Sequence, residues 1–290
     1  MRNYVIVTET TTDLPDEIAK DLDIRVIPMA FELDGKSYYN YLDERELDIH
    51  EFYETLRKGG KSVTSLINTE VFMNFFEPIL NEGCDILYIS FSSGLSGTYN
   101  ASLLAIDELK EKYPDSKIFS VDSRCASLGE GLLVYSAALK KEEGLSIDEL
   151  YEWLNDNVLK LCHWFTVDDL NHLKRGGRVS AISAAIGTAL NVKPVLHVDN
   201  EGKLIPIEKV RGRKKSLIAI ADRMLETCTN PEEQTIFIGH GDAVEDAEYL
   251  AQLIKERMNV KDFVINPIGP VIGSHSGPGT IALFFFGTER

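Results

Sequence analysis

Short apolar runs of strand length alternate with longer helical segments along most of this chain. Residues 4–8, 85–91 and 163–167 have the pattern of buried strands, and residues 99–113 and 126–142 have helical periodicity. A connection between parallel strands has to cross the sheet, and it usually does so as a helix. The alternation therefore predicts an α/β fold whose sheet is mostly parallel and covered by helices.

At 290 residues the chain is too long for one small core and suits two lobes. We predict an N-terminal α/β lobe over residues 1–160, with a mostly parallel sheet, and a C-terminal α/β lobe over residues 161–290. The last apolar run, residues 281–287, could return to either lobe. Residues 179–190 are rich in alanine and other small residues, which predicts close packing in that segment.

Charge and hydropathy exclude several classes of protein. A formal charge of −16 repels a phosphate backbone, so nucleic acid is not an expected partner. No run approaches 18 apolar residues and no signal-peptide pattern precedes the first strand, so we expect a cytoplasmic protein. Four scattered cysteines without a C-x-x-C pair are expected to be reduced thiols.

The positive charge is clustered in two segments, residues 174–178 and 211–215. One interpretation is a solvated basic face. The other is a docking surface for an acidic or phosphorylated partner. The sequence alone leaves both open.

The most informative loop is Ser92–Thr98, with the sequence SSGLSGT, between a strand and a helix. Loops at the carboxyl ends of parallel strands bind ligands in α/β sheets, and the start of the following helix favours an anion. Glycines allow close backbone approach, and Ser93 and Ser96 are among the hydroxyl donors. The loop lacks the lysine of a phosphate-binding Walker loop and the G-x-S-x-G spacing of a nucleophile elbow.

Two further segments carry candidate ligand groups. Thr64 and Ser65 precede a helix and would, alone, indicate only a helix cap. Residues 269–280 hold four glycines and two prolines, which predicts a rigid irregular loop. Its one histidine, His275, could donate a hydrogen bond to a carboxylate or phosphate, or act in acid–base chemistry.

The other titratable residues give no second site. His163, His197 and His240 lie on or at the ends of predicted strands and are interpreted as structural. Asp168 and Asp169 follow a strand but have no accompanying ligand set, so we predict no metal site.

Taken in order, these segments resemble the DegV family nearly from end to end. The resemblance rests on Thr64-Ser65, SSGLSGT at 92–98, VDS at 121–123, SLG at 127–129, L-x-x-LKRGGR at 170–178, Lys193-Pro194, Arg211 and the glycine-proline segment around His275.

The resemblance implies two α/β lobes with a fatty acyl chain in a cleft between them. Hydroxyls matching Thr64 and Ser96 would hold the carboxylate, with Ser65, Ser93 and His275 beside them. Some DegV proteins are the fatty-acid-carrying subunit of bacterial fatty acid kinase, where a separate ATP-binding protein phosphorylates that carboxylate. Arg178 and Arg211 would then contact the partner or the acyl-phosphate. No catalytic residue, cofactor or metal is implied for this chain.

The sequence departs from the family pattern at two places that border the expected pocket. Glu9-Thr10 replaces the usual Asp-Ser after the first strand, and Leu66-Ile67-Asn68 replaces the usual Gln-Pro-Ser. Two alternatives to a fatty acid carrier remain. One is an enzyme subunit related to dihydroxyacetone kinase, in which His275 would hold a small carbonyl or phosphate ligand. The other is a regulatory module that binds a protein through its basic segments.

Overall fold

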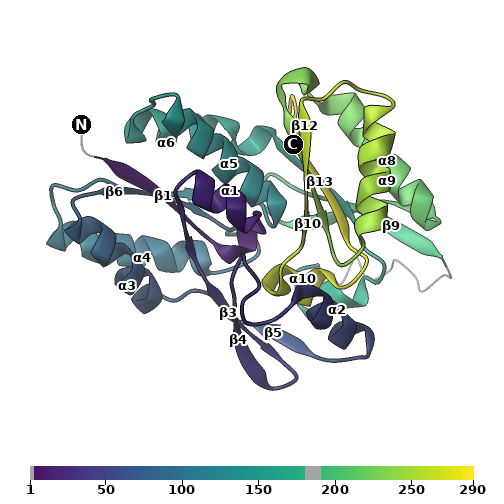
Figure 1. Ribbon diagram of the computed structural model, residues 1–290, viewed down its shortest axis with the longest axis horizontal. Helices are drawn as coiled ribbons and strands as arrows, with labels where there is room; N and C mark the ends of the chain where they lie inside the picture. The colour runs from purple at the N-terminus through teal and green to yellow at the C-terminus, as the bar shows by residue number, and fades with distance from the viewer. Residues whose placement is uncertain (1–2, 180–190) are drawn as a thin grey trace.

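The computed structural model describes residues 3–179 and 191–290, and its two large sheets confirm the predicted α/β fold (Figure 1). The first sheet is entirely parallel, in the order β2-β1-β6-β7. Its strands are β1 (Tyr4–Glu9), β2 (Ile24–Ile27), β6 (Asp85–Ser90) and β7 (Ile118–Asp122). The predicted small-residue segment lies, apart from Val179, outside the described residues.

The second sheet has six strands in the order β10-β9-β8-β13-β11-β12, and only β11 and β12 pair in parallel. The last strand, β13, lies between β8 and β11 and therefore belongs to this sheet. The strands are β8 (Leu161–Thr166), β9 (Val192–Val198), β10 (Leu204–Arg211), β11 (Thr235–His240), β12 (Asp262–Pro267) and β13 (Ile281–Phe286).

A small antiparallel sheet, in the order β4-β3-β5, lies at the bottom of the view in Figure 1. It consists of β3 (Met29–Leu33), β4 (Lys36–Asn40) and β5 (Ser62–Thr64), and the Asp34-Gly35 turn joins β3 to β4. Three residues are too few to show a strand period, yet Thr64 pairs with Phe31 and forms an edge strand.

Helix α5 (Leu128–Glu142) packs between the two large sheets and contacts strands of both. Two glycines allow this close packing. A Cβ at Gly129 would lie 2.8 Å from the Phe284 ring, and one at Gly131 would lie 2.6 Å from the Thr12 carbonyl oxygen. The other helices are α1 (Asp16–Asp21), α2 (Ile49–Arg57), α3 (Thr69–Asn81), α4 (Thr98–Lys112), α6 (Ile147–Asn157), α7 (Asn171–Arg175), α8 (Arg213–Thr227), α9 (Val244–Lys255) and α10 (Pro270–Ser276).

The glycine- and proline-rich segment is not an irregular loop throughout, because it contains helix α10. Pro270 occupies the first turn, where its missing N–H and fixed φ are compatible with a helix. Gly273 leaves room for Tyr53, whose hydroxyl would lie 2.6 Å from a Cβ at that position. Gly277, with φ of 80°, ends the helix. The prediction of an irregular loop was therefore wrong over residues 270–276.

Asp13 links the first sheet to the segment before α10. Its carboxylate accepts hydrogen bonds from Ser127 Oγ at 2.5 Å and from the Gly269 N–H at 2.9 Å. Its carbonyl oxygen accepts one from Asn266 Nδ2 at 2.8 Å. Asp13 is 3% exposed, and burial raises its pKa to about 7, although the hydrogen bonds oppose that rise. Near neutral pH the fold therefore tends to keep a proton here.

Two more buried carboxyl groups, those of Glu9 and Glu130, lie near Asp13. Glu9 accepts hydrogen bonds from Tyr88 Oη at 2.6 Å and the Phe91 N–H at 2.8 Å. Glu130 accepts from Thr8 Oγ1 at 3.1 Å and Thr11 Oγ1 at 3.0 Å. Burial raises the pKa of both carboxyls, and for Glu130 the nearby Glu9 raises it further. Burial at the edge of the first sheet thus favours the protonated form of these carboxyl groups.

Two smaller findings bear on the expectations from sequence. All four cysteines are free thiols, two of them buried. Among residues 3–179 and 191–290, no helix is long and apolar enough to cross a membrane.

The pKa of Asp13 gives a testable dependence of stability on pH. From about pH 4 to 7 the native state keeps a proton that the unfolded chain has lost, so this group's contribution to stability falls as pH rises. Replacing Asp13 with Asn mimics the protonated acid. We expect D13N to gain stability relative to the native chain by roughly 1 kcal/mol per pH unit between pH 5 and 7.

Urea unfolding at several pH values measures this difference. Burial lowers the pKa of His275 to about 4, so its contribution to stability rises with pH. Because His275 is present in both proteins, this contribution cancels from the difference between D13N and the native chain. The exposed control D21N should show no such trend, and a D13N difference that is constant with pH would contradict the assignment.

Candidate functional site

A largely apolar cavity of about 230 Å³ lies between the two large sheets. Its floor comes from the carboxyl edge of the first sheet, at Thr11, Phe91 and Ala126. Strands of the second sheet and helix α10 supply the facing walls. Among the apolar residues on those walls are Phe165, Leu204, Ala282, Val271 and Ile272.

One end of the cavity is polar. Thr64 and Ser96, from the first half of the chain, meet His275 and Arg178 from the second half. Thr64 Oγ1 lies 2.8 Å from His275 Nε2, and this hydrogen bond joins β5 to α10. Helix α4 begins at Thr98, two residues after Ser96, so the partial positive charge of its N-terminus lies beside this hydroxyl. Thr64, Ser96, His275 and Arg178, all predicted from the sequence, thus line the same cavity.

His275 is neutral in this setting. Burial, followed by the positive charge of Arg178, lowers the pKa of His275 to about 4. Its Nδ1 has no hydrogen-bond partner among the described residues. We infer that the proton resides on Nε2 and is donated to Thr64 Oγ1, because this avoids an unpaired buried N–H. The Thr64 hydroxyl proton is then free to be donated into the cavity.

The three serines of the 92–98 loop have different tasks. Ser92 Oγ donates to the Gly202 carbonyl oxygen at 2.7 Å and ties the loop to the β9–β10 turn. Ser93 is exposed, donates to Asp122 Oδ2 at 2.5 Å, and is not among the described residues that line the cavity. Ser96 lines the cavity, and its Oγ lies 2.9 Å from Thr98 Oγ1 and accepts a hydrogen bond from the Thr98 N–H at 3.2 Å. The geometry therefore singles out Ser96 within the loop.

Ser65 also lines the cavity, next to Thr64. The two predicted arginines differ in position, because Arg178 lines the cavity and Arg211 does not. Arg178 crosses the polar end: its Nε donates to the Leu95 carbonyl oxygen at 3.2 Å and its Nη1 to that of Gly176 at 2.5 Å. Arg211 is exposed at the end of β10, where it pairs with Val192, and lies outside the described lining of the cavity.

Gly176 fixes the position of His275 by leaving space for it. A Cβ at Gly176 would lie 2.2 Å from Nδ1, far inside contact distance. Its φ of −71° suits any residue, so the requirement at this position is space alone. The basic segment 174–178 therefore contacts the imidazole directly, at Gly176.

An outer groove of about 650 Å³ lies on the other side of the same residues. Thr64, Arg178 and His275 line both the groove and the cavity, so they form the wall between them. The remaining charged lining is mainly basic, with Asp169 as the acidic member. The basic and imidazole side chains added by the groove are Arg57, Lys61, His172 and Arg175.

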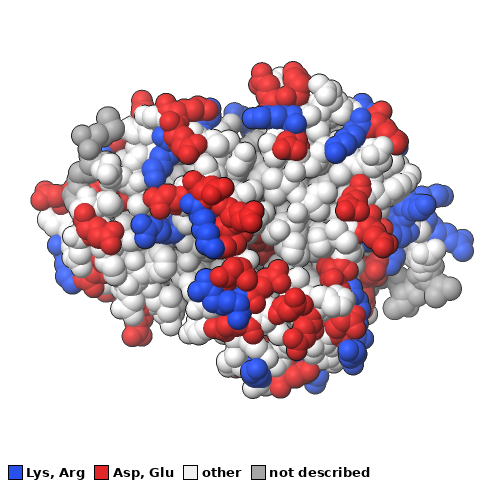
Figure 2. All heavy atoms as spheres, in the orientation of Figure 1, with Lys and Arg blue, Asp and Glu red and all other residues white. Residues whose placement is uncertain are grey.

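Figure 2 shows acidic side chains spread over the face in view with basic ones scattered among them, and the largest basic group lies at the right-hand edge. The segment that begins at Arg211 lies at the end of the β9–β10 hairpin where β9 starts, because Arg211 pairs with Val192.

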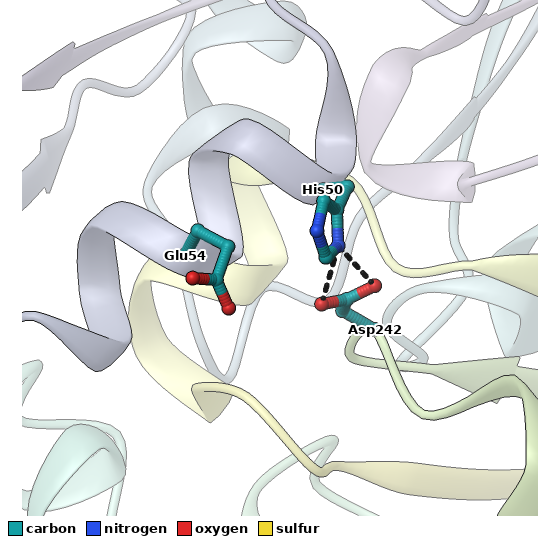
Figure 3. A group of neighbouring side chains, drawn as sticks. All are labelled: His50, Glu54 and Asp242. Carbon is teal, nitrogen blue, oxygen red and sulfur yellow. Dashed lines mark hydrogen bonds and ion pairs between the residues drawn. The ribbon is translucent and has the colours of Figure 1, made fainter.

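His50, Glu54 and Asp242 form a cluster that the sequence did not suggest (Figure 3). His50 Nδ1 lies 3.0 Å from Asp242 Oδ2, and the hydrogen bond to Asp242 raises the pKa of His50. Arg57 Nη1 contacts both Asp242 and, at 3.0 Å, Glu54 Oε1. Because Arg57 pairs with both carboxylates, the cluster acts as an ion-pair contact between α2 and the loop after β11.

Sequence reasoning missed several residues that line the cavity. Thr11 and Ser127 contribute hydroxyls that are held by buried carboxyls. His163, interpreted as structural, also lines the cavity, and so does Ser276. Ser127 and Ser276 lie within segments on which the resemblance rests, but nothing in those segments indicates a position in the cavity, and Thr11 and His163 lie in no such segment.

The architecture and the cavity together define a class: two-sheet α/β proteins that enclose an apolar cavity with hydroxyl and imidazole groups at one end. A family model described as uncharacterised protein, DegV family, matches residues 3–288. The chain belongs to the DegV family.

Relatives of known sequence and structure agree with this. A DegV domain-containing protein of Clostridium perfringens is 51% identical over 290 residues, 100% of this chain and 99% of that protein. A Thermus thermophilus DegV family protein, solved to show fatty acid binding, superposes with a TM-score of 0.89 at 30% identity, covering 99% and 100% of the two chains. DegV of Bacillus subtilis, described as a fatty acid binding protein, gives 0.85 at 29% identity, covering 99% and 100%.

The contact between Gly176 and His275 predicts the effect of one added methyl group. Gly176→Ala should push the imidazole away from Thr64 and cost roughly 1–3 kcal/mol of stability, as overpacking does. Thermal unfolding and the NMR signals of the His275 ring measure the two effects. Gly177→Ala is the control: its Cβ meets nothing within 4 Å, although its φ of 70° is strained. It should leave the ring signals in place, and unchanged ring signals in G176A would contradict the assignment.

Proposed function

We propose that this chain binds a long-chain fatty acid in the cavity and presents its carboxylate to a separate ATP-dependent kinase. The observation that carries the proposal is the meeting of Thr64, Ser96 and His275 at the polar end of an apolar cavity. Fatty acid binding by the Thermus thermophilus and Bacillus subtilis relatives supports it.

The acyl tail supplies most of the affinity in this proposal. A sixteen-carbon tail buried at about 0.8 kcal/mol per methylene gives about 12 kcal/mol before the costs of ordering. Hydrogen bonds to a charged group contribute about 1.5–3 kcal/mol each. The polar end therefore sets the orientation of the ligand and prevents an unpaired buried charge.

Thr64 is the central donor to the carboxylate. His275 donates to its oxygen, so the Thr64 hydroxyl is aimed at the ligand, and Ser96 Oγ offers a second donor. Arg178 adds positive charge at the same end, and Ser65 lies beside Thr64. Ser93 supports the site indirectly. Its N–H and Oγ donate hydrogen bonds to Asp122, and these hold the loop that carries Ser96.

The outer groove is where the phosphoryl donor would approach. It is separated from the cavity only by residues that would touch the carboxylate, and its basic lining suits the phosphates of a nucleotide. Phosphorylation would form an O–P bond between a carboxylate oxygen and the terminal phosphorus of the nucleotide. The bond from that phosphorus to its bridging oxygen would break, and a nucleoside diphosphate would leave. The groups that carry out this transfer would belong to the kinase, and Arg178 and Arg211 would contact the kinase or the acyl-phosphate.

A small carbonyl ligand held covalently on His275 fits the geometry less well. His275 Nε2 is already hydrogen-bonded to Thr64 Oγ1, and His275 Nδ1 lies against Gly176. A covalent adduct at either nitrogen would therefore displace a close neighbour. Nothing in the cavity favours a small polar ligand, since its walls are mainly apolar.

Protein purified from a bacterial host should carry fatty acid that native mass spectrometry detects. Replacing Thr64 with Val, which has nearly the same shape, should weaken palmitate binding by about tenfold or more, since a hydrogen bond to a charged group is lost. The affinity for hexadecanol, which lacks the carboxylate, should change much less.

The matched control is Thr227→Val, at the end of α8, where the hydroxyl bonds to the Arg223 carbonyl oxygen. Its palmitate affinity should equal that of the native chain. Protein that is reproducibly empty and takes up no added fatty acid would refute the proposed function.

Arg211 separates partner contact from ligand binding. Because it is exposed and outside the cavity lining, Arg211→Glu should leave palmitate affinity unchanged and slow phosphorylation by a fatty acid kinase about fivefold or more. The rate of acyl-phosphate formation at limiting carrier concentration measures this. Lys110→Glu, on the exposed face of α4, is the control, and equal rates for both variants would argue against a role of Arg211.

A further inference from the structure

His163 is an imidazole in the wall of the cavity, away from the polar end. It is 4% exposed, and its Nδ1 has no hydrogen-bond partner among the residues that the structure describes. Its neighbours are aromatic: the ring centroids of Phe284 and Phe165 lie 4.5 and 5.5 Å away. An unpaired polar group in such a wall costs free energy that a hydrogen bond would recover.

The position of His163 separates it from the head-group site. It lies on β8, three residues before Thr166, which pairs with Ile281 where β13 starts after α10. At about 3.3 Å per residue, the imidazole is set back by roughly 10 Å from the sheet edge at which α10 leads into β13. Two other described residues of the cavity lining have an unpaired buried atom, Ser276 at Oγ and His275 at Nδ1, and both belong to the head-group end.

The chemistry of His163 selects the kind of group that it can bind. Burial, followed by the charges of Arg290 and His197, lowers the pKa of His163 well below its usual range, so the ring is neutral. A neutral imidazole donates through one nitrogen and accepts through the other. It therefore suits an uncharged oxygen and offers little to a second carboxylate.

We propose that the cavity accepts long-chain acids with a hydroxyl or keto oxygen partway along the chain, and that His163 is the hydrogen-bond partner of that oxygen. This inference rests on the proposed function, because it assumes that the carboxylate lies at Thr64. A plain acyl chain would leave the imidazole unpaired. An oxygenated chain would pair it and would lose little by burying its own oxygen.

Displacement of a fluorescent fatty acid by stearate, 10-hydroxystearate and 12-hydroxystearate tests the proposal. Two positions are compared because the register of the oxygen along the chain decides which isomer reaches His163. At least one hydroxy acid should bind the native chain about fivefold more tightly than stearate does, the worth of one net hydrogen bond. This comparison requires no variant.

Histidine variants then locate the effect. In His163→Phe the ratio of the stearate to the hydroxystearate dissociation constant should fall at least tenfold, because the hydroxyl now enters an apolar wall. His163→Gln, which keeps a donor and an acceptor, should retain part of the preference. The matched control is His197→Phe: His197 also has an unpaired Nδ1, but it stacks on Trp164 and lies outside the described cavity lining. Its ratio should stay within twofold of the native value.

The outcomes separate the inference from the function beneath it. Stearate binding with no preference for either hydroxy acid would overturn the inference and leave the proposed function intact. A preference that survives unchanged in His163→Phe would overturn the assignment to His163. If no acid binds, stearate included, the proposed function fails and takes the inference with it.

Discussion

Asp13 joins the two halves of the molecule, and the cavity exists only where they join. Its carboxyl is bonded to Ser127 at the start of α5 and to Gly269 before α10, and its carbonyl to Asn266. Burying this acid is tolerable because burial raises the pKa of Asp13 to about 7, so the protonated form is accessible, and its oxygens are hydrogen-bonded. The same contacts position Ser127 on one wall of the cavity and the start of α10 on another, so the ligand site inherits its shape from this joint.

Much of the fold follows from local pattern, and much of the site does not. The alternation of strands and helices predicts the parallel sheet, and the Asp34-Gly35 pair predicts the β3–β4 hairpin. Both depend on residues that are neighbours in sequence. The pairing of Thr64 with His275 joins residues 211 positions apart. Thr11, Ser127 and His163 line the cavity through packing of distant segments, and helix α10 is hidden by its glycines. Composition near a residue carries no record of such contacts.

The resemblance to a family reached residues that pattern alone could not. Thr64 by itself would have been assigned to a helix cap, yet it lies at the polar end of the cavity with Ser96 and His275. The structure also divides labour that the sequence presents as one motif. In the 92–98 loop, one serine holds the two halves together, one holds the loop itself, and one faces the cavity.

The contact between Gly176 and His275 has a consequence for how such a protein can evolve. In the proposed function the basic segment 174–178 presents positive charge to a partner. The same segment touches the imidazole, because any side chain at 176 would enter the space of Nδ1. Under that proposal, substitutions that alter partner binding are expected at the exposed Lys174 and Arg175, while position 176 has to remain glycine.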